Sequence, residues 1–280
     1  VDSEPRAGKR PGAFCETSFL SGESRVFMSY TGSLNDISTL AHETGHAFHS
    51  EIMKNMVPYS QKYPMTLAET ASTFAEKILA DGILKDPKSS DALKLSVLTN
   101  SINDTISYML DIPIRFKFEK AFHEERQNGE VSVSRLKEIM SETMRNTFGE
   151  MMEKGGENPY YWASKLHFYA TDVTFYNFPY TFGYLLSCGL MSMFKEEGSK
   201  FLPKYEAFLK FTGDEMAHKV AKKTLKVEKS ISIFGEKKLH ELSMIYNTKN
   251  CFETLRLFGT NFVIYNKDKC YLIIDQQKSE

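Results

Sequence analysis

Cysteine is scarce in this sequence, and long apolar runs are missing. The four cysteines lie far apart and form no CxxC pair, which excludes a disulfide scaffold and favours free thiols in a reducing cytosol. No stretch approaches about 18 consecutive apolar residues, so we expect no transmembrane helix. The first residues, Val1-Asp2-Ser3-Glu4-Pro5, have neither the basic nor the apolar segment of a signal peptide. The sequence therefore predicts a cytoplasmic protein.

An excess of charge of one sign is also missing. The formal net charge is -1, which gives no reason to expect nucleic acid or a membrane surface as a partner. There are no internal repeats and no low-complexity segments. What is present is 280 residues, of which 41% are hydrophobic and 25% charged. This composition is typical of a globular protein with a sizeable core in one or two domains.

Periodicity and turn residues predict a mainly α, multi-helix fold. Residues 1–23 are rich in Gly, Pro and Ser and are expected to form a loop, followed by a short strand over residues 25–30. Asn35 and Asp36 offer N-caps for the first helix. The predicted helices cover residues 36–54, 66–80, 91–127 with a kink near Pro113, a stretch from Ser132 or Ser134 to 148, residues 160–195 interrupted near Pro179, and residues 200–225. In the tail, residues 261–265 and 270–274 have the spacing of a β-hairpin.

The segment His42-Glu43-Thr44-Gly45-His46 is an HExxH motif within the first predicted helix. Residues four apart on an α-helix differ by about 40° around the axis and about 6 Å along it, so two imidazoles at this spacing converge on one metal ion. Glu43 projects from the same side and can reach a metal-bound water as a general base without becoming a ligand. The motif predicts one Zn²⁺ per chain, with His42 and His46 as ligands.

A catalytic zinc usually has three protein ligands, and the third must come from elsewhere in the chain. The subclass that uses a third histidine is excluded, because His49 and Ile52 occupy the positions that would hold its glycine and histidine. Glu69 and Glu76 on the next predicted helix are the candidates. Glu69 also fits a capping box with Thr66, in which it would bond only to backbone. Glu76 suits the role of orienting a ligand histidine. His49 suits a place in the core or beside a ligand.

Several separated motifs together resemble one known family. The run from Tyr30 to Asp36, leading into Leu40 to Ser50, resembles the oligoendopeptidase F branch of the thimet oligopeptidase family of zinc metallopeptidases. Further segments agree with it in the same order. They are Ala68-Glu69-Thr70-Ala71-Ser72, His167-Phe168-Tyr169 and the run from Tyr176 to Tyr184. The resemblance covers about residues 6 to 226.

The resemblance implies a mainly helical, zincin-like endopeptidase that cleaves short peptides inside a deep channel. Glu69 then matches the glutamate ligand of the family. His167, Tyr180 and Tyr184 match a segment that stabilises the tetrahedral intermediate, with Tyr176 as a third candidate. These tyrosines are spaced four residues apart, which is also the pattern of an ordinary packed helix face. The strand at residues 25–30 is expected to pair with an extended substrate.

The sequence also departs from the family pattern. The resemblance places a large region before residue 1 of this chain, and we expect that region to be a partner that forms the other wall of the channel. Residues 1–226 are predicted to form the catalytic domain, and residues 227–280 a divergent tail. The main hypothesis is a zinc-dependent endopeptidase of short oligopeptides. The alternative is a weak or inactive zinc-containing fragment that binds peptides or a partner chain.

Overall fold

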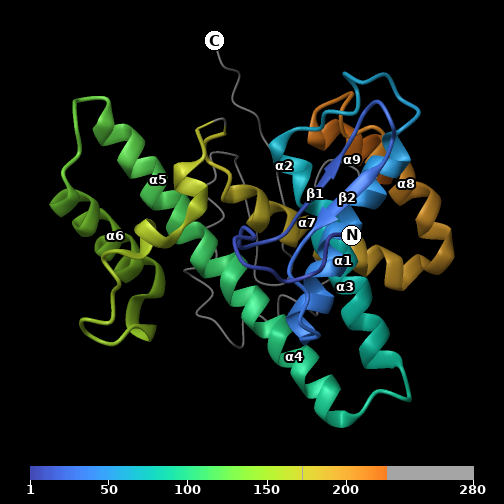
Figure 1. The fold of residues 1–280 in the computed structure, drawn as a ribbon, viewed down its shortest axis with the longest axis horizontal. Coiled ribbons are helices and arrows are strands. Elements are labelled where there is room, and N and C mark those ends of the chain that lie inside the picture. The colour runs from blue at the N-terminus through green and yellow to red at the C-terminus, as the bar shows by residue number, and fades with distance from the viewer. Residues whose placement is uncertain (172, 226–280) are drawn as a thin grey trace.

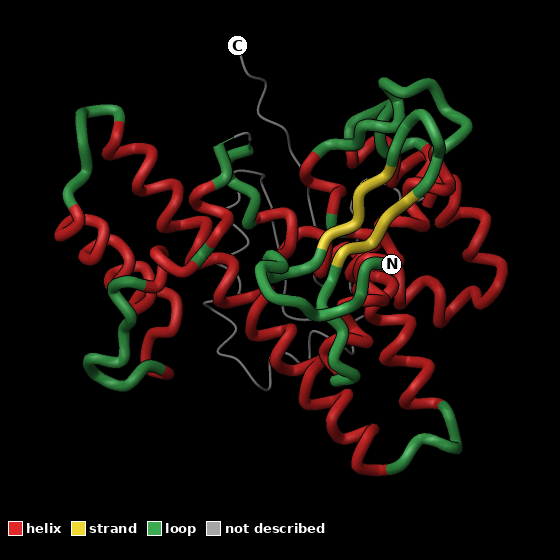
Figure 2. Tube along the Cα trace, viewed as in Figure 1, coloured by secondary structure: helices red, strands yellow, loops and turns green. Residues whose placement is uncertain are grey.

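The computed structural model describes residues 1–171 and 173–225, and this part of the chain is mainly helical, as predicted (Figures 1 and 2). The predicted hairpin at residues 261–274 lies outside the described residues. The elements, in chain order, are β1 (Phe14–Thr17), β2 (Ser24–Phe27), α1 (Leu34–Met53), α2 (Met65–Ala68), α3 (Thr70–Lys85), α4 (Asp91–Ile106), a π-helical segment (Ser107–Asp111), α5 (Ile112–Arg126), α6 (Val133–Phe148), short 3₁₀ turns (Gly149–Met151, Tyr161–Ser164 and Leu166–Tyr169), α7 (Phe178–Glu197), a 3₁₀ turn (Gly198–Phe201), α8 (Leu202–Lys210) and α9 (Ala217–Leu225).

The first helix, α1, begins one residue earlier than its predicted cap. Ser33 is the N-cap, and its hydroxyl accepts a hydrogen bond from the Asp36 amide at 3.1 Å. The Asp36 carboxylate accepts in return from the Ser33 amide at 3.0 Å. This is a capping box, and it satisfies two backbone donors that the helix itself leaves free. Asp36 therefore belongs to the cap as its third helical residue, and the prediction of Asn35 or Asp36 as N-cap is wrong.

A two-stranded antiparallel sheet precedes α1, so the prediction of an unbroken loop over residues 1–23 is wrong. β1 pairs with β2 in the register Phe14 to Phe27, and the rings of these two residues stack at 4.9 Å. The strand was missed because β1 has only four residues and its flanks are rich in turn formers. The sheet lies against α1 (Figure 1).

The second edge of β2 is already occupied by the start of the chain. The Asp2 amide donates to Val26 O at 2.8 Å, and the amides of Met28 and Tyr30 donate to Asp2 O and Ser3 O. With β1 on one side and these residues on the other, Val26 and Phe27 have partners on both edges of β2. Pairing of the strand at residues 25–30 with a peptide stays a prediction.

The long helical stretch that ends at Arg126 changes from α to π geometry over Ser107–Asp111, just before Pro113. The Ile112 amide donates to Ser107 O, five residues back, and Pro113 has no amide hydrogen to donate. Tyr108 O is thereby left without a helical donor. The Thr181 hydroxyl of α7 donates to it at 2.5 Å, which ties α7 to this irregular segment.

Two predicted helices are shorter in the structure. Residues 160–171 and 173–177 form two 3₁₀ turns and irregular backbone, and α7 begins only at Phe178, with Pro179 in its first turn. Proline suits that position because its missing amide hydrogen has no partner there anyway. Pro179 therefore starts a helix instead of interrupting one. The stretch over residues 200–225 is two helices, α8 and α9. A Cβ at Gly213, between them, would lie 2.0 Å from Ser60 O.

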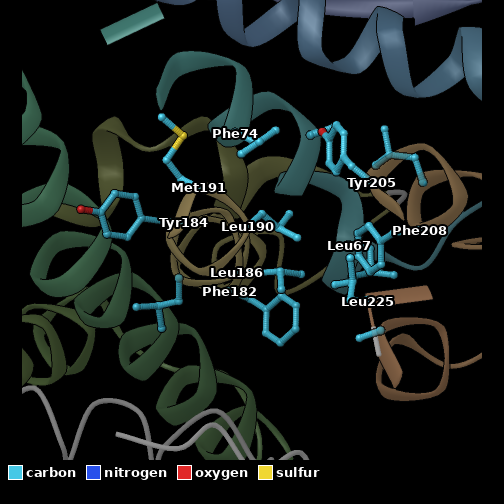
Figure 3. Packing of buried hydrophobic residues seen from close by; sticks show 14 of the residues in the cluster. Leu67, Phe74, Phe182, Tyr184, Leu186, Leu190, Met191, Tyr205, Phe208 and Leu225 are labelled. Carbon is cyan, nitrogen blue, oxygen red and sulfur yellow. The ribbon is translucent and has the colours of Figure 1, made fainter. Parts of the chain in front are cut away.

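Two clusters of buried apolar side chains hold the fold together. The larger surrounds α7, with Leu186 and Leu190 at its centre (Figure 3). The smaller joins α5 to α6. Full burial of a large apolar side chain stabilises the fold by about 1.5–3 kcal/mol, so the larger cluster contributes most of the apolar stabilisation around α7. In the smaller cluster the buried members are Ile114, Phe118, Ile139, Met140 and Met144.

Among the described residues, no helix is long and apolar enough to cross a bilayer. Cys15 and Cys188 carry free thiols, as predicted, and Cys251 and Cys270 lie outside the described part of the chain.

We expect Thr181→Val to destabilise the fold, because valine keeps the shape of threonine but leaves the partly buried Tyr108 carbonyl without a donor. The cost should be about 1–3 kcal/mol in the free energy of unfolding, measured by urea denaturation. Thr99→Val is the matched control. The Thr99 hydroxyl is exposed and bonds only to Leu95 O of its own helix at 2.9 Å, so its loss should cost less than about 0.5 kcal/mol. Equal losses in the two variants would contradict the role given to Thr181.

Candidate metal centre

Two histidines of α1 and one glutamate beyond it bring their donor atoms together. His42 Nε2 lies 3.2 Å from Glu69 Oε2, and His46 Nε2 lies 3.4 Å from the same oxygen. One donor atom from each of the three residues falls within 4.8 Å of the other two. A tetrahedral zinc with bonds of about 2.0–2.1 Å separates its ligand atoms by roughly 3.3–3.4 Å. The spacing and the donor types, two imidazole nitrogens and one carboxylate oxygen, therefore fit a divalent metal such as zinc.

Close backbone contacts on two sides fix the position of Glu69. It connects α2 to α3 and is 3% exposed. A Cβ at Gly45 of α1 would lie 2.5 Å from Ala71 O, and a Cβ at Gly183 of α7 would lie 2.6 Å from the Glu69 carbonyl carbon. Only glycine allows backbones to approach this closely. The two glycines thus let α1 and α7 close on Glu69 from either side.

The capping-box interpretation of Glu69 is wrong. Helix α2 is preceded by Pro64 as its N-cap, and no side chain caps it. The Glu69 carboxylate instead accepts hydrogen bonds from the Ser72 hydroxyl at 3.0 Å and from the Tyr176 hydroxyl at 2.9 Å. These two donors orient the carboxylate with Oε2 toward the histidines. No feature of the sequence singled out Ser72, although its place in α3, three residues after the N-cap Glu69, suits this contact.

Glu76 takes the orienting role that its spacing predicted. Its carboxylate is hydrogen-bonded to His42 Nδ1, which leaves Nε2 of the same ring facing Glu69. A carboxylate on the second ring nitrogen fixes the tautomer of a metal-binding histidine and makes it a better ligand. Glu76 lies seven residues, or about two turns, beyond Glu69, on the side of α3 that faces α1.

The histidines and glutamates at the centre shift one another's pKa values. Burial opposes protonation of His42, but the hydrogen bonds to Glu69 and Glu76 outweigh it and raise the pKa of His42 to about 10. Burial alone would raise the pKa of Glu69, yet the hydrogen bonds to His42 and His46 lower it. The site therefore holds an ionised carboxylate in a buried place, where a cation is favoured.

Glu43 lies between the two histidines in the sequence and is 5% exposed. Its Oε2 is buried and has no hydrogen-bond partner. Burial raises the pKa of Glu43, and the positive charges of His42 and His46 partly oppose that effect. An unpaired carboxylate oxygen in a buried site is costly unless another group occupies the space beside it. This oxygen is therefore a second observation, besides the donor set, that fits a site built for a metal and a water.

The aromatic segment contributes two tyrosines and one histidine to this side of the molecule. Tyr176 reaches Glu69 directly, and its ring lies 5.8 Å from that of Tyr180. The Tyr180 hydroxyl lies 3.2 Å from His167 Nε2. Burial raises the pKa of both phenols, with the Glu69 charge adding to it, and burial lowers the pKa of His167. At neutral pH these shifts favour protonated phenols, which can donate, and an uncharged His167 imidazole.

The structure does not bring Tyr184 to this group, so it gives no support to the predicted role of Tyr184 in catalysis. Its hydroxyl is 2.6 Å from that of Thr105 on α4, and its ring stacks on Tyr108 at 5.0 Å. Figure 3 shows it among the core side chains around α7. Tyr176, the third candidate from the sequence, is the phenol in contact with Glu69. It precedes α7 on irregular backbone, so it does not lie on the helix face that its four-residue spacing suggested.

His49 belongs to the core. It is fully buried, with Nε2 2.8 Å from the Thr212 hydroxyl and 3.2 Å from Leu209 O, and its ring stacks on Tyr63 at 4.1 Å. Burial lowers its pKa to about 3. Of the two roles considered for His49, the structure supports the one in the core.

Solved structures share this fold over most of the chain. A Chlamydophila abortus protein assigned as a peptidase is 25% identical, with a TM-score of 0.61 over 90% of this chain and 41% of its own. PZ peptidase A, solved with an inhibitor, is 20% identical and superposes with a TM-score of 0.66 over 89% of this chain and 43% of its own. Peptidases of known structure therefore share the helical fold of this chain.

Sequence relatives identify the family. Residues 1–238 match peptidase family M3. The chromosomal oligoendopeptidase F of Lactococcus lactis subsp. cremoris is 35% identical over 196 residues, which is 66% of this chain and 30% of the relative. The plasmid-encoded form is 31% identical over 221 residues, or 75% and 34%. The chain belongs to peptidase family M3, in its oligoendopeptidase F branch, and spans about a third of the length of these relatives.

We expect Gly183→Ala to disturb the centre without touching a donor atom, because the added Cβ would press on the Glu69 backbone. The variant should lose at least about 1–3 kcal/mol of stability and bind Zn²⁺ more weakly than the parent chain. Thermal unfolding and a chelator competition measure the two effects. Gly82→Ala on α3 is the control, because a Cβ there meets nothing within 4 Å and alanine favours a helix by about 0.5–1 kcal/mol. Unchanged zinc affinity in Gly183→Ala would contradict the close-contact argument.

Proposed function

We propose that residues 1–226 carry the catalytic centre of a zinc-dependent endopeptidase that hydrolyses short oligopeptides. One observation carries the proposal. The donor atoms of His42, His46 and Glu69 converge, and the unpaired, buried Oε2 of Glu43 belongs to the same motif. Membership of the oligoendopeptidase F branch supports the same reaction class.

Zinc held by these three residues would supply the Lewis acidity that lowers the pKa of water and polarises a peptide carbonyl. Glu43 is the proposed general base. It takes a proton from the attacking water and gives it to the leaving amine, so that no charge has to leave the site during the reaction. Its raised pKa brings the carboxylate nearer to the range in which a group can both accept and release a proton at neutral pH.

Tyr180 and His167 are the proposed donors to the oxygen of the scissile carbonyl. The two groups are 3.2 Å apart and both are partly buried, so they can approach one substrate atom from the same side. A donor placed where negative charge develops lowers the barrier by roughly 2.7–4 kcal/mol. Tyr176 is proposed to act on Glu69 instead, because its hydroxyl already donates to that carboxylate.

A second candidate function follows from the length of the chain, which spans about a third of its relatives. The alternative is a zinc-containing chain that binds peptides, or a partner chain, and hydrolyses them weakly by itself. Substrate positioning is worth roughly 7–11 kcal/mol and needs surfaces on both sides of the peptide. The region that the family resemblance places before residue 1 is the partner expected to supply the second surface.

The two functions are separated by one comparison at equal zinc occupancy. The 280-residue chain and a longer form that includes the preceding region are assayed on the same fluorogenic peptide, with and without a chelator. Hydrolysis by the longer form alone supports the proposed reaction with a two-part channel. Equal kcat/KM in both forms shows that this chain is sufficient. Chelator-insensitive hydrolysis, or none in either form, would sink the proposed function.

Glu43→Gln should retain zinc and lose nearly all activity, because glutamine keeps the shape of the side chain but accepts no proton at neutral pH. Turnover is measured in whichever form hydrolyses the peptide, and metal content by elemental analysis. Glu51→Gln, at an exposed position on the same helix, is the control and should keep wild-type turnover and zinc. Wild-type turnover in Glu43→Gln would exclude the general-base role.

Tyr180→Phe should lower kcat and kcat/KM together by about 10²–10³-fold, with zinc content unchanged, because it removes a donor used mainly in the transition state. Tyr184→Phe is the matched comparison. It removes the hydroxyl paired with Thr105, so its effect should fall on the free energy of unfolding, by about 1 kcal/mol, and spare turnover. The reverse pattern, with Tyr184→Phe the catalytic defect, would restore the assignment made from the sequence.

A further inference from the structure

A buried carboxylate far from the metal ligands in sequence holds the turn that precedes α7. Glu119 of α5 is 4% exposed. Its Oε1 accepts a hydrogen bond from the Phe175 amide at 2.7 Å, and its Oε2 accepts one from Asn177 Nδ2 at 3.2 Å. The two oxygens thus bond to residues on either side of Tyr176. Asn177 is itself fully buried, so water does not compete for these contacts.

The turn held in this way is strained. Phe175 has φ 60, and it is the one non-glycine residue with positive φ in the part of the chain that the structure describes. For a bulky side chain this conformation costs of the order of 1–3 kcal/mol and persists only where the surroundings impose it. The Phe175 ring packs on Phe116 and His123 of α5, at 5.8 and 5.1 Å. Helix α5 therefore fixes both the backbone and the side chain of Phe175.

The conformation of Phe175 decides where Tyr176 points. The Asn177 amide donates to Phe175 O at 2.8 Å, which closes a three-residue turn with Tyr176 at its tip. From there the Tyr176 hydroxyl donates to Glu69 Oε1 at 2.9 Å, while the other oxygen of Glu69 faces the two histidines. A continuous set of contacts therefore runs from Glu119 through the turn to the carboxylate of the candidate metal ligand.

We propose that Glu119 is a positioning residue for the metal centre. By holding Phe175 and Asn177, it presents the Tyr176 hydroxyl to Glu69 and so fixes the orientation of the carboxylate toward His42 and His46. The inference rests on the proposed zinc site, and it adds a residue from α5 that the HExxH motif and the glutamate helix do not include. The hydrogen bonds of Glu119 in the described part of the chain go to Phe175 and Asn177 and to none of the three proposed metal ligands, so it acts through Tyr176.

The test measures zinc affinity by chelator competition, without any peptide substrate, in the 280-residue chain. The variants are Glu119→Gln, Tyr176→Phe and the double variant. Glutamine fits the space but has one acceptor oxygen for two donors. Each single variant should weaken zinc binding by about tenfold, the lower end of the loss seen when an outer contact of a metal ligand is removed. The double variant should bind no more weakly than the weaker single variant, because both changes break the same connection.

Glu124→Gln is the matched control, since Glu124 lies on the same helix, is exposed and forms only a 3.8 Å ion pair with Lys120. It should leave zinc affinity unchanged. Amide hydrogen exchange gives a second readout. If Glu119 only contributed to packing in general, its loss would not speed exchange at Phe175 selectively. The Phe175 amide should exchange faster in Glu119→Gln, whereas the amides of α1 and α3 should not. If Glu119→Gln does not fold, Asn177→Ala removes one of the two bonds and should give the same pattern more weakly.

The outcomes separate this proposal from the one it rests on. A parent chain that binds no zinc overturns both. A parent chain that binds zinc, with wild-type affinity in Glu119→Gln and a marked loss in Tyr176→Phe, overturns the role of Glu119 alone. If the losses in zinc-binding free energy of the two single variants add up in the double variant, Glu119 and Tyr176 act independently, and the positioning role of Glu119 is overturned as well.

Discussion

Everything at this centre depends on three backbones meeting around one residue. Glu69 lies where α1 and α7 approach the junction of α2 and α3, and the approach is possible because Gly45 and Gly183 present no side chain there. A methyl group at either glycine would overlap backbone atoms, which have no rotamer by which to move away. The ligand carboxylate is thus placed by main-chain packing first. Hydrogen bonds from Ser72 and Tyr176 then set its orientation.

This arrangement also explains how a buried acidic cluster is tolerated. Glu43, Glu69, Glu76 and Glu119 all lie in poorly solvated surroundings, and isolated buried carboxylates are costly. Three of them are compensated: Glu69 and Glu76 face imidazoles, and Glu119 accepts two neutral donors. Among these four, Glu43 alone has a fully buried oxygen without a hydrogen bond. It is also the carboxylate proposed to transfer protons, and unsatisfied buried polar atoms tend to persist at such sites.

The sequence predicted the local chemistry better than the long-range contacts. Helical spacing was enough to place His42 and His46 together, and seven-residue spacing put Glu69 and Glu76 on one face. Periodicity could not show that Tyr184 faces Thr105, because it relates residues within a helix but does not say which neighbour the helix faces. Tyr176 and Glu119 depend on a turn with positive φ at Phe175, a residue type that gives no hint of that conformation. Strand β1 was not predicted because it has only four residues. The Thr66–Glu69 capping box fits the local sequence, but in the structure the Glu69 carboxylate bonds to Ser72 and Tyr176 instead.

The π-helical segment at Ser107–Asp111 has a consequence for the phase of the helix that follows it. A π turn accommodates one residue more than an α turn does, and each residue of an α-helix turns the side-chain direction by about 100°. Helix α5 is therefore rotated by about that angle relative to a straight continuation of α4. With an uninterrupted α-helix, the carboxylate at position 119 would face a different neighbour than the turn before α7. The π-helical segment, about ten residues before Glu119, thus sets the direction in which the side chains of α5 point relative to the metal centre.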